Sequence, residues 1–128
     1  MSMAQAVMAE AYRKKLARQA LNGQAAPRAA FMAFGDGGLD GDRKARPFDA
    51  ARNGLYHELI RKPLIQVQQE DLFSVTCTGR LERTDLVGFV ISEAAVLDAN
   101  GDPMGFKSFG GKDKEADEFI DVVIKIKY

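Results

Sequence analysis

The chain has 128 residues, of which 46% are hydrophobic and 28% charged, and its 18 basic residues balance its 18 acidic residues. This composition is ordinary for one globular domain and argues against disorder, and no apolar run approaches the roughly 20 residues that a membrane-spanning helix needs. The single cysteine excludes an intramolecular disulfide framework. No secretory signal is expected, because the N-terminus lacks a basic start followed by an apolar block.

The zero net charge hides an asymmetry between the two halves of the chain. Residues 1–62 contain 11 Lys or Arg and 6 Asp or Glu, a net +5, whereas residues 63–128 contain 7 and 12, a net −5. The split is compatible with random drift of surface residues, or with a basic end that meets an acidic end in an assembly. Nucleic-acid binding is not expected, because the basic half shows no stripe interleaved with aromatic residues.

The first predicted element is a helix over residues 3–22. Ala4, Met8, Tyr12 and Leu16 recur every four residues, which places them on one face that would pack on a sheet. Asn22-Gly23 then supplies a C-cap that tolerates the left-handed conformation. Residues 29–34 form the next candidate, a short strand that ends at Gly35-Asp36-Gly37-Gly38, and a short helical segment is predicted from Pro47 to Asn53-Gly54.

The second half of the chain shows the alternation that is typical of half-buried strands. Residues 64–69 and 73–81 are predicted to form an antiparallel pair, with Phe73, Val75, Cys77 and Leu81 facing inward. The last strand covers residues 119–128, with Val122, Ile124, Ile126 and Tyr128 inward. Residues 112–118 form a charged connection with no predicted structure.

Residues 88–109 read GFVISEAAVLDANGDPMGFKSF and predict a hairpin. Apolar runs at 89–97 and 104–109 flank Asn100-Gly101, a pair that tolerates the positive φ of a tight turn, and Pro103 is expected to end the pairing on its side. The predicted fold class is therefore α+β, with an N-terminal helix packed on a mostly antiparallel β-sheet of about five strands.

No catalytic or cofactor motif is complete. Asp36, Asp40 and Asp42 suggest a calcium loop, but Gly38 and Pro47 stand where an EF-hand needs ligands. We therefore predict no metal, no cofactor and no enzymatic activity. A small soluble ligand- or cation-binding domain that uses the loop from Gly35 to Asp42 is kept as the alternative function.

The two residues with reactive side chains receive ordinary interpretations. Cys77 is predicted to act as a small hydrophobic residue on the inward face of its strand. His57 is the only histidine, and in a strand it would point away from the face that carries Glu58. A hydrolase that uses His57 is a third hypothesis, for which the sequence indicates no substrate.

Three segments of the chain resemble the N-terminal domain of phage tail fibre (tail-collar fibre) proteins. That family shows a Gly-Phe-x-Ile-x-Glu-x-x-Leu-x-Asp-x-x-Gly hairpin, which is matched here by Gly88, Phe89, Ile91, Glu93, Asp98 and Gly101. Gly35-Asp36-Gly37 fits a second family motif, and Leu55, Glu58, Arg61 and Leu64 fit a third. The chain departs from the pattern at Ala95, where the family has glycine.

The resemblance implies a single domain over residues 1–128 that joins a tail fibre to the baseplate of a phage or prophage by protein–protein contact. Such fibres are trimers, their partners are other tail or baseplate proteins, and the expected location is the virion tail, or the host cytoplasm during assembly. The chain ends where the attachment domain would end, so we expect that domain alone or a short adaptor.

Eight residues are the predicted structural or docking residues of this domain: Gly35, Asp36, Gly37, Arg61, Phe89, Glu93, Asn100 and Gly101. The resemblance suggests that Glu93 has a structural partner, for which Arg61 is the prediction. The alternative is that Glu93 is an outward or edge charge that discourages aggregation.

Overall fold

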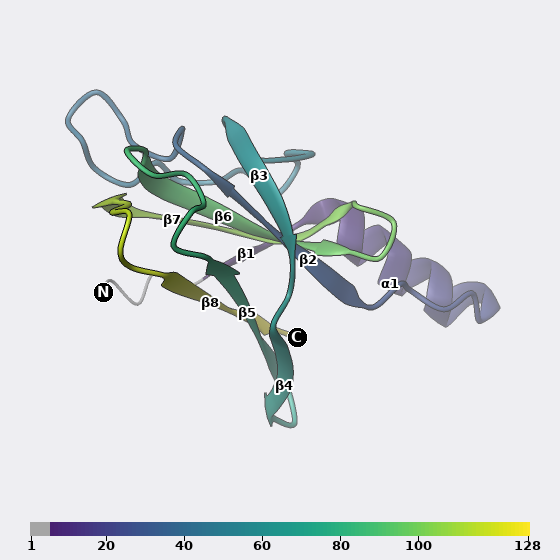
Figure 1. Cartoon of the computed structure of the whole chain (residues 1–128). Helices are drawn as coiled ribbons and strands as arrows, with labels where there is room; N and C mark the ends of the chain where they lie inside the picture. Colours follow the sequence, from purple (N-terminus) through teal and green to yellow (C-terminus); the bar gives the residue numbers. More distant parts are fainter. Residues whose placement is uncertain (1–5) are drawn as a thin grey trace.

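The computed structural model describes residues 6–128, which form two β-sheets with one helix at their side (Figure 1). The first sheet has five strands in the order β1-β7-β6-β2-β3, the second has three in the order β4-β5-β8, and every pair is antiparallel. The chain is thus mostly β with one short helix, and the coarse α+β prediction holds. The single sheet of about five strands is wrong, since the strands divide into two. In chain order the elements are β1 (Val7–Met8), α1 (Glu10–Asn22), β2 (Ala29–Gly35), β3 (Glu58–Pro63), β4 (Gln66–Asp71), β5 (Ser74–Leu81), β6 (Val90–Asp98), β7 (Pro103–Asp113) and β8 (Ile120–Lys127).

The helix α1 begins later than the sequence predicts. Val7 and Met8 are extended and pair with Phe106 and Gly105 of β7, and the fully buried Ala9 donates its N–H to the carbonyl of Met104 (2.9 Å). Pairing with β7 therefore overrides the helical periodicity of this stretch, and the part of the prediction before residue 6 lies outside the described residues. The predicted end is confirmed, because Gly23 is left-handed (φ 76°) and donates its N–H to Gln19.

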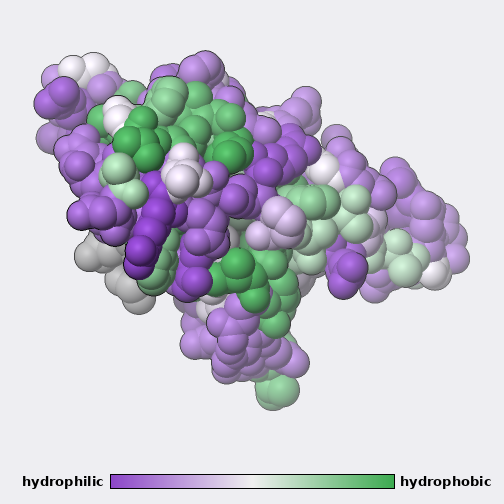
Figure 2. All heavy atoms as spheres, in the orientation of Figure 1, coloured by the Kyte–Doolittle hydropathy of each residue, from purple (hydrophilic) through white to green (hydrophobic). Residues whose placement is uncertain are grey.

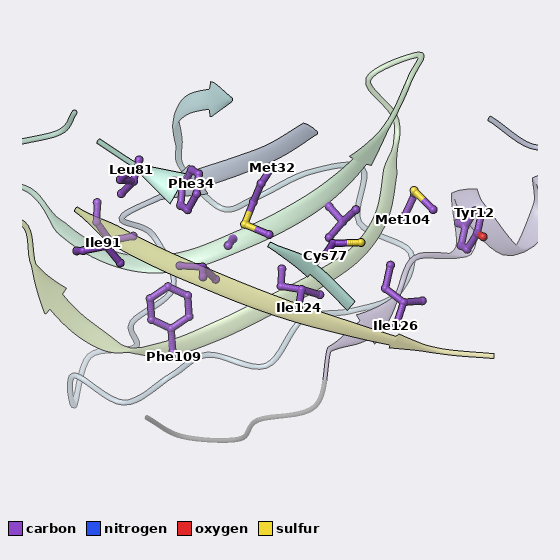
Figure 3. Close-up of a cluster of buried hydrophobic side chains, with 14 residues drawn as sticks. Tyr12, Met32, Phe34, Cys77, Leu81, Ile91, Met104, Phe109, Ile124 and Ile126 are labelled. Carbon is purple, nitrogen blue, oxygen red and sulfur yellow. The ribbon is translucent and has the colours of Figure 1, made fainter. Parts of the chain in front are cut away.

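The main core lies between the two sheets, where β2, β6 and β7 face β5 and β8 (Figure 3). The alternation predicted for β5 and β8 is confirmed at Cys77, Ile124 and Ile126, which are at most 2% exposed. Phe73 and Tyr128 are instead 69% and 51% exposed. They lie just outside β5 and β8, joined by a hydrogen bond from the N–H of Tyr128 to the carbonyl of Phe73 (2.7 Å), at an end of the sheet that extends away from the first sheet (Figure 1).

The other face of the five-stranded sheet is covered by the long segment between β2 and β3. Phe48 from this segment stacks on Phe106 of β7, with ring centroids 4.9 Å apart, in a second apolar cluster that includes Leu55 and Leu97. The helix predicted from Pro47 is wrong: residues 47–54 form an irregular turn, in which the carboxylate of Asp49 accepts the N–H of Ala51 (2.9 Å).

The predicted hairpin is confirmed as β6 and β7, with Gly101 in the left-handed region (φ 84°). Pro103 does not end the pairing, since it is the first residue of β7 and lies opposite Leu97. β7 continues to Asp113, into residues for which no structure was predicted. β3, which pairs with β2 and is separate from β4, was also missed.

Candidate functional site

The most unusual group in the chain is the carboxylate of Glu93, in the middle of the five-stranded sheet. The residue is fully buried on β6, which lies between β7 and β2. Its Oε2 accepts the backbone N–H groups of Gly37 and His57, and its Oε1 accepts that of Tyr56, each at 2.8 Å. Three N–H donors therefore solvate a buried charge that would otherwise be costly. We call this arrangement the Glu93 anchor.

Glycines make the anchor sterically possible. A Cβ on Gly35 would lie 2.3 Å from the carbonyl oxygen of His57 and 2.5 Å from Oε2 of Glu93. A Cβ on Gly37 would lie 2.8 Å from Cβ of Tyr56. Real Cβ atoms do not approach other atoms this closely, so side chains at these positions would push the loop away from Glu93. The Gly-Asp-Gly segment therefore has a packing role.

Arg61 is not the partner of Glu93, which corrects the sequence prediction. Arg61 pairs with Glu58 of its own strand (3.0 Å), and both side chains are partly exposed. Register explains the difference. Gly35 lies opposite both Glu93 and Glu58, whereas Arg61 is three residues beyond Glu58 and lies opposite Ala33. The alternative prediction, an outward or edge charge, is also wrong, since Glu93 is buried in an internal strand.

His57 and Asp36 form a pair at the solvent side of the anchor. Nδ1 of His57 lies 2.5 Å from Oδ1 of Asp36, and the histidine side chain is 67% exposed. The hydrogen bond to Asp36, together with the attraction of its negative charge, raises the pKa of His57 above the ordinary 6.5. Within residues 6–128, no hydroxyl or thiol group hydrogen-bonds to this imidazole ring, so a nucleophile that it could activate is missing from its contacts.

This pair predicts a pH dependence of stability. The pKa of His57 is higher in the folded state than in the unfolded state, so protonation of His57 stabilises the fold. This stabilisation is complete at a pH below the unfolded-state pKa of 6.5, and it is lost as the pH rises through the folded-state pKa. NMR titration of the single histidine should therefore give a pKa above 6.5, and Asp36→Asn should lower that pKa, because it removes the largest cause of the shift. A wild-type pKa at or below 6.5 would contradict the pairing.

Asn100 and Gly101 form the turn between β6 and β7, and α1 holds this turn in place. The buried carboxylate of Asp98 accepts the N–H groups of Asn100 (2.9 Å) and Asp102 (3.1 Å). Nζ of Lys15 lies 2.6 Å from Asp98 and 2.7 Å from Asp102. Part of the charge complementarity between the two halves of the sequence is thus satisfied inside the chain.

Phe89 lies apart from the anchor, in the loop that leads into β6. Its N–H donates to Leu86 (3.1 Å) and its carbonyl accepts from Lys114 (3.0 Å). Val87, Phe89 and Val90 are each at least 40% exposed. The structure therefore separates the predicted residues into three places: the anchor, the Asn100-Gly101 turn and this apolar loop. The side chain of Arg61 belongs with the turn, because a Cβ on Gly101 would lie 3.0 Å from its Nη1.

Sequence reasoning missed several residues around the anchor. Gly38 donates its N–H to Oγ of Ser92 (2.9 Å), and the guanidinium groups of Arg46 and Arg52 lie 3.7 Å and 3.9 Å from the ring centroid of Tyr56. The only available signal for Gly38 was that it directly follows Gly37, which makes two consecutive glycines. The arginine–tyrosine contacts have none, because they depend on how an irregular segment folds.

The acidic residues of the glycine-rich loop do not converge. Asp36 contacts His57, while Oδ1 of Asp40 accepts the N–H groups of Asp42 (2.8 Å) and Lys44 (2.9 Å) of its own turn. Among residues 6–128, no group of three or more His, Cys, Asp or Glu side chains is placed to hold a metal ion. Burial raises the pKa of Cys77 to about 11, which keeps the thiol protonated.

The described part of the chain contains no helix that is long and apolar enough to cross a membrane. Comparisons with protein-family models, with curated proteins and with solved structures gave no match to this chain.

Proposed function

We propose that this protein is a structural component of a phage or prophage tail, and that it joins a tail fibre to the baseplate by protein–protein contact. The proposal begins from the three segments that resemble the tail-fibre attachment domain. Its partners are other tail or baseplate proteins, and by the resemblance three copies associate in the assembled fibre. The protein then acts in the virion tail, and it is present in the host cytoplasm during assembly.

The observation that carries the proposal is that all three segments meet at the Glu93 anchor. Glu93 belongs to the hairpin segment, Gly37 to the Gly35-Asp36-Gly37 segment, and Tyr56 and His57 lie within the segment from Leu55 to Leu64. These segments are far apart along the chain, since 56 residues separate Gly37 from Glu93. Short motifs that matched by chance would have no reason to converge on one buried carboxylate. Their convergence supports a shared scaffold in which each segment has a structural role.

A contact role also agrees with the kind of surface that the chain presents. The anchor fixes the segment between β2 and β3, and the salt bridges of Lys15 fix the Asn100-Gly101 turn. Rigid turns of this kind make specific contacts at little entropic cost. The exposed apolar loop around Phe89 supplies the area that such a contact would remove from water.

Mass spectrometry of particles purified from an induced lysogen that carries the gene tests the proposal. The expected result is peptides of this protein at a stoichiometry near that of the other tail proteins. Intact and infectious particles that lack the protein would contradict the proposal, and ligand binding by the loop from Gly35 to Asp42 would then become the leading hypothesis.

A matched pair of variants tests the contact itself. Phe89→Ser should reduce incorporation of the protein into particles, whereas Leu21→Ser should not, because Leu21 is 84% exposed on α1 and belongs to none of the three segments. Equal incorporation of both variants would exclude the Phe89 loop as the docking surface. Thermal melting of each variant checks that the fold is intact.

A further inference from the structure

The strand edges of the two sheets are protected to very different degrees. An unprotected edge exposes unpaired N–H and C=O groups that can pair with another strand, and proteins block such edges with lysine, proline, bulges or short strands. β1 has only two residues, and the part of β7 beyond it contains Gly110, Gly111 and Lys112. β3 ends in Arg61-Lys62-Pro63. Each of these edges is therefore blunted.

The edge of β8 is covered by a side chain from the first sheet. Lys107 of β7 is only 8% exposed and donates a hydrogen bond from Nζ to the backbone carbonyl of Val123 (3.2 Å). β8 also carries Lys125 and Lys127. A second strand that approached β8 would have to displace the ammonium group of Lys107.

β4 is the exception among the described edges. All six of its residues are exposed, and it contains no lysine, arginine or proline. Its one irregularity lies at the turn end, between Gln69 and Asp71. The strand projects from the body of the molecule as an arm of the β4–β5 hairpin (Figure 1).

The sheet face beside this edge is apolar and uncovered. Val67 lies opposite Cys77, which in turn lies opposite Ile124, so Val67 is on the face that forms the core elsewhere in the sheet. It is nevertheless 50% exposed, as is Ile65 just before the strand. Figure 2 shows apolar side chains at the base of the projecting hairpin and at its tip.

We propose that β4 pairs with β4 of a second copy of this chain, antiparallel and about a twofold axis at Val67. The axis places Val67 opposite Val67, Ile65 opposite Gln69, and Gln66 opposite Gln68. Residues of the same face then meet, and the two three-stranded sheets become one sheet of six strands. An antiparallel edge is complementary to itself, which is the requirement for a twofold interface.

The charges on β4 favour this register. Glu70 and Asp71 are its only charged residues, and both lie at the turn end. With the axis at Val67, each Glu70 lies opposite Leu64 of the other copy, and the two copies of Glu70 are about 20 Å apart along the strands. With the axis at Gln69, the same carboxylates would be only about 7 Å apart and would repel one another.

The number of copies in solution tests the proposal. Sedimentation of the full chain, from about 1 μM to about 1 mM, should show a monomer–dimer equilibrium. Val67→Lys places two ammonium groups opposite each other and should raise the dissociation constant at least about tenfold. The matched control is Val123→Lys on the protected edge strand of the same sheet, where the residue is 40% exposed, and it should leave the equilibrium unchanged.

Cross-linking reports the register directly. The cross-strand Cα distance at a twofold axis is about 4.5–5.5 Å, which a disulfide can span. Because Cys77 lies opposite residue 67 within the same chain, the test uses a Cys77→Ala background. There, Val67→Cys should form a disulfide-linked dimer under mild oxidation, whereas Val123→Cys should not.

A single copy at every concentration, an unaltered equilibrium in Val67→Lys, or no cross-link through Val67→Cys would overturn the β4 pairing. A mass of three copies would also overturn it, while supporting the trimer that the tail-fibre resemblance implies. The β4 pairing does not depend on the tail proposal, since it concerns two copies of the isolated chain, so the two can fail separately.

Discussion

Replacing Glu93 by alanine should lower the free energy of unfolding by about 3 kcal/mol, because three backbone N–H groups lose their acceptor at once. The donors belong to Gly37, Tyr56 and His57, and the side chain that holds them is fully buried. Glu93→Gln should cost roughly half as much, since its amide keeps one acceptor oxygen but turns an NH₂ group toward a donor. Chemical denaturation of the three proteins measures these differences.

Amide hydrogen exchange separates loss of the anchor from a general loss of stability. In Glu93→Ala the N–H groups of Gly37, Tyr56 and His57 should exchange faster under native conditions, while those in the middle of β5 keep their protection. Glu82→Ala is the control, because Glu82 is exposed, and it should stay within about 0.5 kcal/mol of the wild type. Uniformly faster exchange, or a cost for Glu93→Ala no larger than that of the control, would show that the anchor does not hold the loop.

Local patterns in the sequence were sufficient for the elements whose partners are close along the chain. Asn100-Gly101 between two apolar runs indicated the hairpin of β6 and β7, and Gly23 indicated the end of α1. Alternation in β5 and β8 showed which residues share a face. It could not show whether that face is covered, so Phe73 was expected in the core and is exposed. Whether a residue of the three-stranded sheet is covered depends on how far the five-stranded sheet extends over it.

The anchor could be predicted only in part, because backbone donors leave no signature in the side-chain sequence. Charge matching proposed Arg61 as the partner of Glu93, since an opposite charge is the only partner that residue types reveal. The structure uses N–H groups instead, brought there by the pairing of Gly35 with both Glu93 and Glu58. The division into two sheets was missed for a similar reason: β3 and β4 are separated by only two residues, and nothing in the residue types shows that the chain passes from one sheet to the other between them.

The anchor also depends on a glycine, and Gly35→Ala should destabilise the protein by about 3 kcal/mol. The added methyl group would lie 2.3 Å from the carbonyl oxygen of His57 and 2.5 Å from Oε2 of Glu93. The first is a backbone atom of the neighbouring strand segment and the second is held by its own hydrogen bonds, so neither can move without breaking the anchor. β2 and β3 would have to separate at the Gly35 end.

Gly41→Ala is the matched control in the same loop, because a Cβ there meets nothing within 4 Å. It should leave stability unchanged or raise it by a few tenths of a kcal/mol, because the unfolded chain loses conformational freedom. Thermal and urea unfolding of the two alanine variants give the comparison directly. If Gly35→Ala were as stable as Gly41→Ala, the close approach of Gly35 to Glu93 would be wrong. The convergence of the three segments, on which the proposed function rests, would then lose its physical basis.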